Sequence, residues 1–151
     1  MPLHQDEQGF LRRVLLDHEE AVALCSDLFE ISQVWDDLVD RDRPVDDETI
    51  NRAFWRALVE VPSNPFYQRH FTTLQPLVQA SIIDWLDANT LQAEGGEKRA
   101  AAYVLRDSVG ALVIHCARII GGYDYMREVS AEIRRAVYSE EALKTFMETA
   151  E

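Results

Sequence analysis

The residues with the clearest chemical potential are three closely spaced aspartates, Asp36, Asp37 and Asp40. On a helix each residue turns by about 100°, so Asp36 and Asp40 share a face and Asp37 lies beside them. Towards the N-terminus that face continues through Phe29, Cys25 and Val22. Three negative charges at a helix C-terminus oppose the macrodipole, which favours cations there. The cluster is therefore expected to need a compensating positive charge.

A divalent cation is one candidate for that charge. Mg²⁺ prefers oxygen ligands and usually takes one or two carboxylates together with phosphate oxygens. This interpretation makes Asp36, Asp37 and Asp40 metal ligands and a diphosphate-bearing small molecule the partner. The alternative is that Arg41, Arg43 or an arginine of another helix neutralises the cluster, or that the cluster is a solvated helix end. The spacing alone does not decide between them.

A second polar set lies on a long helix expected over Glu97–Ile120. It consists of Asp107, Ser108, His115 and Arg118. The rest of this helix is apolar nearly all round, which is typical of a buried helix, and buried charges must find partners. Either these side chains form a structural network with each other, or they face Asp36 and Asp40 across an acidic pocket.

The elements that must position these residues are helices throughout. Apolar residues recur every three or four positions, which predicts an all-α bundle of about six helices in a single domain, residues 1–151. Asp17 and Glu20 have the spacing of a capping box, and Asn64 with Pro65 has that of a helix start. The expected helices are 9–16, 17–40, 46–61, 65–93 with a break near Pro76, and 97–120 closed by Gly121 and Gly122, followed by one or two shorter helices over about 123–138 and 140–150.

Charge restricts the partners. The net charge is −12 and the chain has only two lysines, which disfavours nucleic acids and anionic membrane surfaces. From residue 17 to residue 48 there are twelve acids and two arginines. A secretory signal and an apolar run of transmembrane length are both missing, and Cys25 and Cys116 fit reduced, buried thiols. These features predict a cytoplasmic protein with no nucleic-acid or membrane partner.

Residues 31–40, ISQVWDDLVD, resemble the first aspartate-rich motif of class I isoprenoid and terpene synthases. The resemblance implies that Asp36, Asp37 and Asp40 bind Mg²⁺ ions that hold a substrate diphosphate, and that the bundle is a reduced isoprenoid-synthase-like core. Only Asp107 corresponds to the second metal motif of those enzymes, so the resemblance leaves catalysis open. The overall pattern also resembles small phage or prophage proteins with such a core.

Two alternatives remain from the sequence. Glu19 and Glu20, followed by Asp37 and Asp40, are similar to the acid pairs of all-α nucleotide pyrophosphohydrolases. The other alternative is a non-enzymatic acidic interaction protein that binds a basic partner or forms a homodimer. The surface expected for such a dimer is the first helix, with Phe10, Leu11, Val14 and Leu15.

Overall fold

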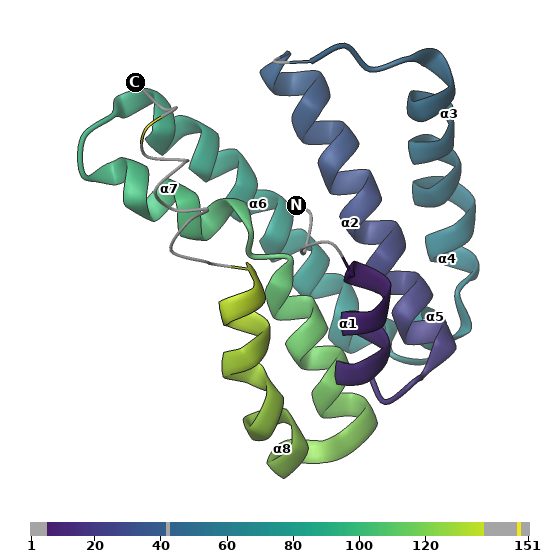
Figure 1. Cartoon of the computed structure of the whole chain (residues 1–151). Coiled ribbons are helices and arrows are strands. Elements are labelled where there is room, and N and C mark those ends of the chain that lie inside the picture. Colours follow the sequence, from purple (N-terminus) through teal and green to yellow (C-terminus); the bar gives the residue numbers. More distant parts are fainter. Residues whose placement is uncertain (1–5, 42, 138–147, 149–151) are drawn as a thin grey trace. The chain divides into compact units, whose positions relative to one another are not determined.

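The computed structural model describes residues 6–41, 43–137 and 148. Every regular element within these residues is helical, which confirms the all-α class (Figure 1). The chain divides into two compact units, residues 1–71 and 72–151, and each is described by itself. Among the described residues no single helix is long and apolar enough to cross a membrane. The pair α7 (Lys98–Arg106) and α8 (Gly110–Val137), bent by 43°, meets that test only when taken together.

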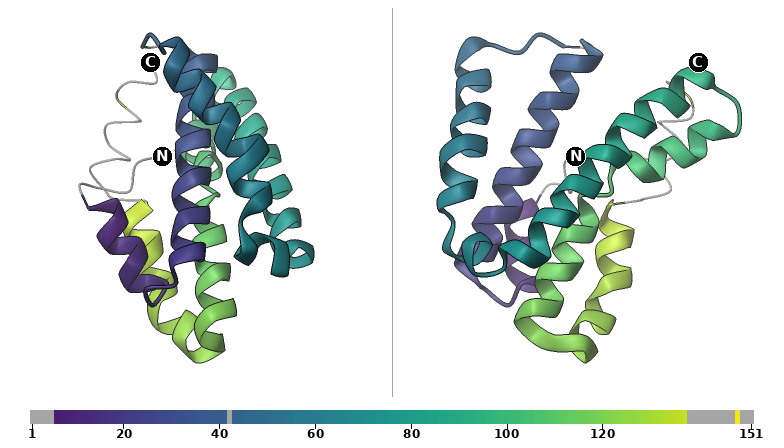
Figure 2. Two further views of the ribbon diagram at one scale, coloured as in Figure 1. Left: turned by 90° about the vertical axis from the view of Figure 1, so that its right-hand side faces the viewer. Right: turned by 180° about the vertical axis from the view of Figure 1, so that it is seen from behind.

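The first unit is built around one long helix, α2, which contacts every other helix of the unit. Its buried residues, including Ala21, Leu24, Cys25 and Phe29, cover more than one stripe, so α2 packs on more than one side as its sequence predicts. In Figures 1 and 2, α3 and its continuation run beside α2. The elements are α1 (Glu7–Val14), α2 (Glu19–Asp40), α3 (Asp47–Trp55), the π-helix η1 (Arg56–Glu60), α4 (Val61–Ser63) and α5 (Pro65–Arg69).

The start of α2 differs from the predicted capping box. Asp17 has a left-handed backbone with φ of 57° and lies one residue too early to cap the helix. His18 is the N-cap instead, because its Nδ1 accepts a hydrogen bond from the Ala21 amide at 3.3 Å. Glu20 is turned to Arg69, whose Nη2 lies 3.3 Å from the Glu20 carboxylate. The capping-box prediction is therefore wrong.

The third helix begins as predicted and continues in an unexpected way. Asp46 is its N-cap and accepts a hydrogen bond from the Thr49 amide at 2.8 Å. The helix then widens into η1 and passes without a break into α4, which holds Pro62 in its first turn. Asn64 ends α4 and caps α5, and Pro65 occupies the first position of α5, as predicted.

The second unit contains α6 (Phe71–Glu94), α7 (Lys98–Arg106) and α8 (Gly110–Val137), where α6 begins at the last residue of the first unit. The break expected near Pro76 lies instead at His70, between α5 and α6, and Pro76 is inside α6. Gly95 and Gly96, both with positive φ, form the turn between α6 and α7 as predicted.

The predicted single helix over residues 97–120 is wrong. The chain turns at Asp107–Val109, where the amides of Gly110 and Ala111 bond to the carbonyls of Asp107 and Ser108 three residues back. Gly122, with φ of 88°, then folds α8 back on itself as a hairpin, which Figure 2 shows. A Cβ atom on Gly110 would lie 3.2 Å from Val137, so glycine lets the two arms approach closely. The predicted helix 123–138 corresponds to the second arm, and the predicted helix 140–150 lies outside the described residues.

Candidate functional site

The three aspartates lie on the last two turns of α2, as predicted. The side chain of Asp37 is only 13% exposed. Its carboxylate accepts a hydrogen bond from Gln33 Nε2 at 3.0 Å and lies 3.5 Å from Arg43 Nε. Arg43 therefore supplies part of the positive charge that the cluster needs. In the part of the chain that the structure describes, no three His, Cys, Asp or Glu side chains are arranged to hold a metal ion.

A hollow of about 410 Å³ lies beside Asp37. Its lining combines one carboxylate, two guanidinium groups and an apolar rim: Asp37, Arg41, Arg43, Leu38, Pro44 and Val45. Arg41 ends α2 in a left-handed conformation with φ of 57°. Two arginines in one hollow can receive an anionic group by charge-assisted hydrogen bonds. The hollow thus has features of an anion site as well as of a cation site.

A larger groove of about 470 Å³ lies between the C-terminal half of α2 and the helix formed by α3 and η1. Its lining is entirely apolar and comes from both walls: Ile31, Val34, Trp35, Leu38 and Val39 from α2, and Ala53, Phe54 and Ala57 from α3 and η1. On α2 these residues follow the three-and-four spacing of a single helical face. The groove therefore offers two parallel rows of apolar side chains.

The groove leaves large apolar side chains in contact with solvent. Trp35 is 41% exposed and Phe54 60% exposed, and the apolar surface continues to Leu58 at 71%. All three belong to apolar stripes with three-and-four spacing, which is the pattern that predicts core residues, and the structure instead leaves them exposed. Soluble proteins rarely leave a large contiguous apolar surface exposed unless it binds something. This surface is the main candidate for a functional site.

One end of the groove carries a compact group of charges. Asp27 lies one turn before Ile31 on α2, and Arg56 Nε is 3.6 Å from its carboxylate. Burial raises the pKa of Asp27; Arg56 lowers it, and the nearby carboxylates of Glu60 and Glu30 raise it further. Trp55 Nε1 donates a hydrogen bond to Glu60 at 2.9 Å. This end thus holds one ion pair, Arg56 with Asp27, and two further carboxylates, Glu30 and Glu60, that act on the ionisation of Asp27.

The π-helical turn belongs to the wall of the groove. Arg56 and Ala57 are the first residues of η1, and Ala57 lines the groove. A π-helix is rare, occurs mostly as a single turn inserted in an α-helix, and is frequently found at functional sites. Its position here is a second indication that this wall has a role beyond packing.

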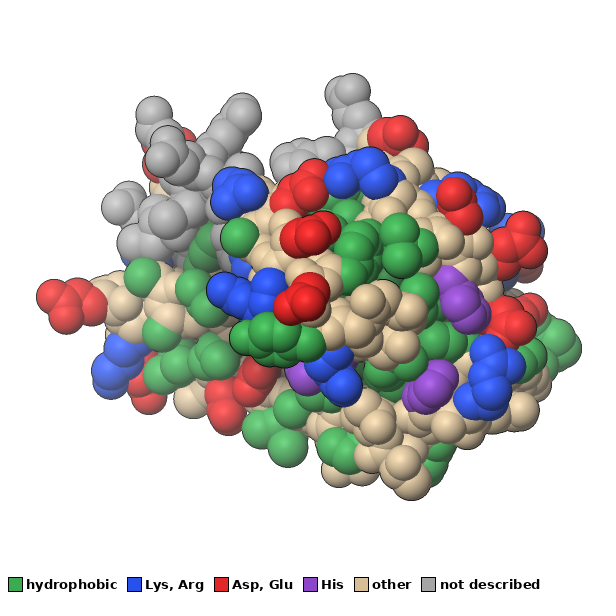
Figure 3. All heavy atoms as spheres, turned by 90° about the horizontal axis from the view of Figure 1, so that it is seen from below, with side chains coloured by type: hydrophobic (Ala, Val, Ile, Leu, Met, Phe, Trp, Pro, Cys, Tyr) green, Lys and Arg blue, Asp and Glu red, His purple; other side chains and the backbone are tan. Residues whose placement is uncertain are grey.

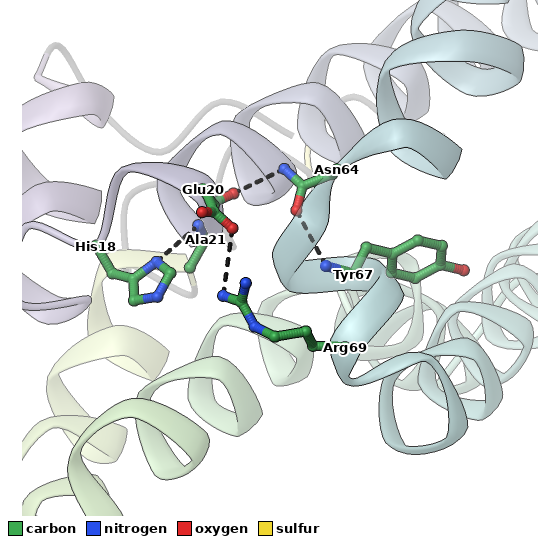
Figure 4. A network of polar contacts seen from close by, with 6 residues as sticks. All are labelled: His18, Glu20, Ala21, Asn64, Tyr67 and Arg69. Carbon is green, nitrogen blue, oxygen red and sulfur yellow. Dashed lines mark hydrogen bonds and ion pairs between the residues drawn. The ribbon is translucent and has the colours of Figure 1, made fainter.

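A buried polar contact joins α2, near its N-terminus, to the segment between α4 and α5 (Figure 4). Asn64 is 8% exposed. Its Nδ2 donates to the carbonyl of Glu20 at 2.9 Å, and its Oδ1 accepts from the Tyr67 amide at 3.0 Å. The His18 ring also packs edge-on against Phe66, with centroids 5.0 Å apart. The N-terminus of α2 is therefore tied to α4 and α5, while the apolar groove lies towards the other end.

Comparison with known proteins finds no matching family, no matching curated protein and no matching solved structure. The resemblance of residues 31–40 to an aspartate-rich motif is therefore neither supported nor contradicted by a relative. The two acid pairs of the pyrophosphohydrolase alternative do not lie close together, because Glu20 and Asp37 are near opposite ends of the same helix, α2, about 25 Å apart along its axis.

The predicted polar line of the second unit is divided. Asp107 and Ser108 lie in the turn between α7 and α8, whereas His115 and Arg118 lie on α8. His115 Nδ1 is buried and has no hydrogen-bond partner within the described part of the chain. Burial lowers the pKa of His115, and Arg118 and Arg134 lower it further. The surroundings of His115 thus favour its neutral form.

Of the four residues expected to form a dimer surface on the first helix, three are buried and Phe10 is partly exposed. Leu11, Val14 and Leu15 are completely buried, so they belong to the core.

Cys25 and Cys116 are buried free thiols, as predicted. The sequence does carry a signal for the groove. The two long helical segments within residues 19–60 both have broad apolar faces, and two helices that lie side by side cannot bury the whole of both faces.

Proposed function

We propose that the protein is a non-enzymatic binding module that takes up an α-helix of another protein in the groove between α2 and α3. The observation that carries this proposal is the groove itself, with eight apolar lining residues and with Trp35 and Phe54 exposed. Apolar grooves between helices bind amphipathic helices through residues spaced at three, four and seven positions.

The groove suits a helix better than other occupants. An extended peptide usually adds to the edge of a sheet, and the described residues contain no strand. A cavity of about 150 Å³ holds a benzene-sized group, so the groove has room for roughly three bulky side chains. A small polar ligand would need several polar groups to orient it, and among the eight lining residues only Trp35 has a side-chain hydrogen-bonding group, its indole N–H.

Selection from a display library of amphipathic helices tests this proposal. Phe54→Asp places a charge in the apolar surface, and Ala57→Gln fills the groove without changing charge. Each is expected to weaken the selected helices at least about tenfold, as for a central interface residue. Ile83→Asp is the matched control, because Ile83 is 56% exposed on α6 and lies outside the groove. If no helix is enriched, or if binding survives both groove variants, the proposal is wrong.

A second candidate is the binding of a diphosphate-bearing molecule together with Mg²⁺ by Asp36, Asp37 and Asp40. The hollow that joins Asp37 to Arg41 and Arg43 favours it. A thermal melt with Mg²⁺ and pyrophosphate tests it, because a ligand that binds only the folded state raises the midpoint. This candidate requires a rise in wild type that is lost in Asp36→Asn/Asp40→Asn. An unchanged wild-type midpoint at millimolar ligand would exclude it.

A further inference from the structure

We infer that the helix bound in the groove is basic, with lysine or arginine on the polar positions that flank its apolar face. This inference rests on the proposed function and specifies the class of partner. The groove is apolar along its length, so it selects for an amphipathic helix but not for a particular charge. Selection by charge must come from the residues around it.

Those residues are predominantly acidic. From Asp27 to Glu60, the stretch that forms both walls and the loop between them, there are ten acids, four arginines and no lysine, a net charge of −6. Three of the four arginines are already ion-paired: Arg43 with Asp37, Arg52 with Glu48 and Arg56 with Asp27. The stretch therefore keeps a net negative charge when these ion pairs are taken into account.

The acids lie at both ends of the groove. At one end, Glu30 and Glu60 lie close enough to Asp27 to act on its ionisation, and Arg56 is the cation paired with that carboxylate. At the other end, Asp47 lies in the first turn of α3, more than one turn before the lining residues Ala53 and Phe54, and the neighbouring Glu48 is paired with Arg52. A bound helix with basic residues near both ends would place each beside an acidic group.

Charge argues against a second copy of this chain as the occupant. Each chain carries a net charge of −12, so two grooves brought face to face would also bring their acids together. Basic side chains do occur elsewhere, and Figure 3 shows them interspersed with acidic ones on the face that it draws. They do not form an extended basic surface there that could match the acidic ends of the groove.

The test uses three helical peptides of about 20 residues with the same apolar face and with lysine, glutamine or glutamate at the flanking positions. The lysine peptide is expected to bind the full chain about tenfold more tightly than the glutamine peptide at about 0.05 M salt, from a few exposed charge pairs. This preference should shrink at about 0.5 M salt, where exposed charges are screened. The glutamate peptide should bind most weakly.

A matched pair of variants separates local charge from net charge. Glu30→Gln/Asp47→Asn/Glu60→Gln neutralises three acids near the groove, and Asp87→Asn/Asp124→Asn/Glu128→Gln neutralises three exposed acids of the second unit. The first variant should lose most of the preference for lysine, and the second should keep it.

Two results would overturn the inference alone. One is equal binding of the three peptides. The other is an equal loss of the preference for the lysine peptide in both triple variants. In either case, loss of peptide binding in Phe54→Asp would still support the proposed function. A wild-type dimer that Phe54→Asp makes monomeric would show a second copy in the groove and overturn the basic partner. Failure of all three peptides to bind would overturn the proposed function and the inference together.

Discussion

At the scale of single residues, the structure depends on a few polar side chains with fixed partners. Asn64 is the clearest example, because both ends of its buried amide are used: one bonds to α2 and the other caps α5. The sequence predicts the cap, since Asn followed by Pro is a typical helix start. The bond to the Glu20 carbonyl, 44 residues away, depends on how the helices pack and has no local signal.

Asn64→Ala should therefore destabilise the protein more than an ordinary cap substitution. It removes the cap and leaves the Glu20 carbonyl without its donor, so the expected loss is about 1–3 kcal/mol in the free energy of unfolding. Chemical denaturation measures it. Asn64→Ser is the control, because serine keeps a capping oxygen without the amide donor and adds no charge, and it should fall between alanine and wild type. A loss below about 0.5 kcal/mol for Asn64→Ala would contradict this account.

At the scale of elements, periodicity predicts where helices lie but not where they break. The C-terminal end of α2 agrees with prediction, and so do the starts of α3 and α5, because Asp46, Asn64 and Pro65 act locally at those two starts. The break at Asp107–Val109 contains no proline, and backbone hydrogen bonds between residues three apart continue through it. The widening into η1 likewise has no sequence signature. Such features depend on packing between helices, which local spacing does not record.

The hairpin of α8 has a consequence for pH dependence. His115 and Arg118 lie on its first arm and Arg134 on its second, and burial with these two cations lowers the pKa of His115 below its ordinary value of 6.5. The unfolded chain then binds a proton more readily than the folded chain. The contribution of His115 to stability is therefore present above pH 6.5 and is lost as the pH falls through that value towards the lowered pKa.

His115→Gln should remove this part of the pH dependence. Between about pH 7.5 and about pH 5, the melting temperature of wild type should fall more steeply than that of the variant. Thermal melts of the two proteins in matched buffers measure the difference. Parallel curves for the two proteins over this range would show that His115 is not held neutral by its surroundings.

At the scale of the whole molecule, the sequence predicts the fold class better than the candidate site. The hydrophobic pattern predicts an all-α chain, and the described residues confirm it. The same pattern places Trp35 and Phe54 in the core, whereas both are exposed. An apolar helical face is equally consistent with a core and with a binding surface, and only the arrangement of the helices distinguishes them. The magnesium site predicted at Asp36, Asp37 and Asp40 stays a prediction.

The central claim is that the groove between α2 and α3 binds a helix, and the indole signals of the three tryptophans test it most directly. Trp35 lines the groove, whereas Trp85 lies on α6. In a two-dimensional NMR titration with a selected basic helix, with signals assigned by Trp→Phe substitutions, the Trp35 signal should shift and saturate while the Trp85 signal stays unchanged. Saturable binding that leaves the Trp35 signal in place would contradict the claim.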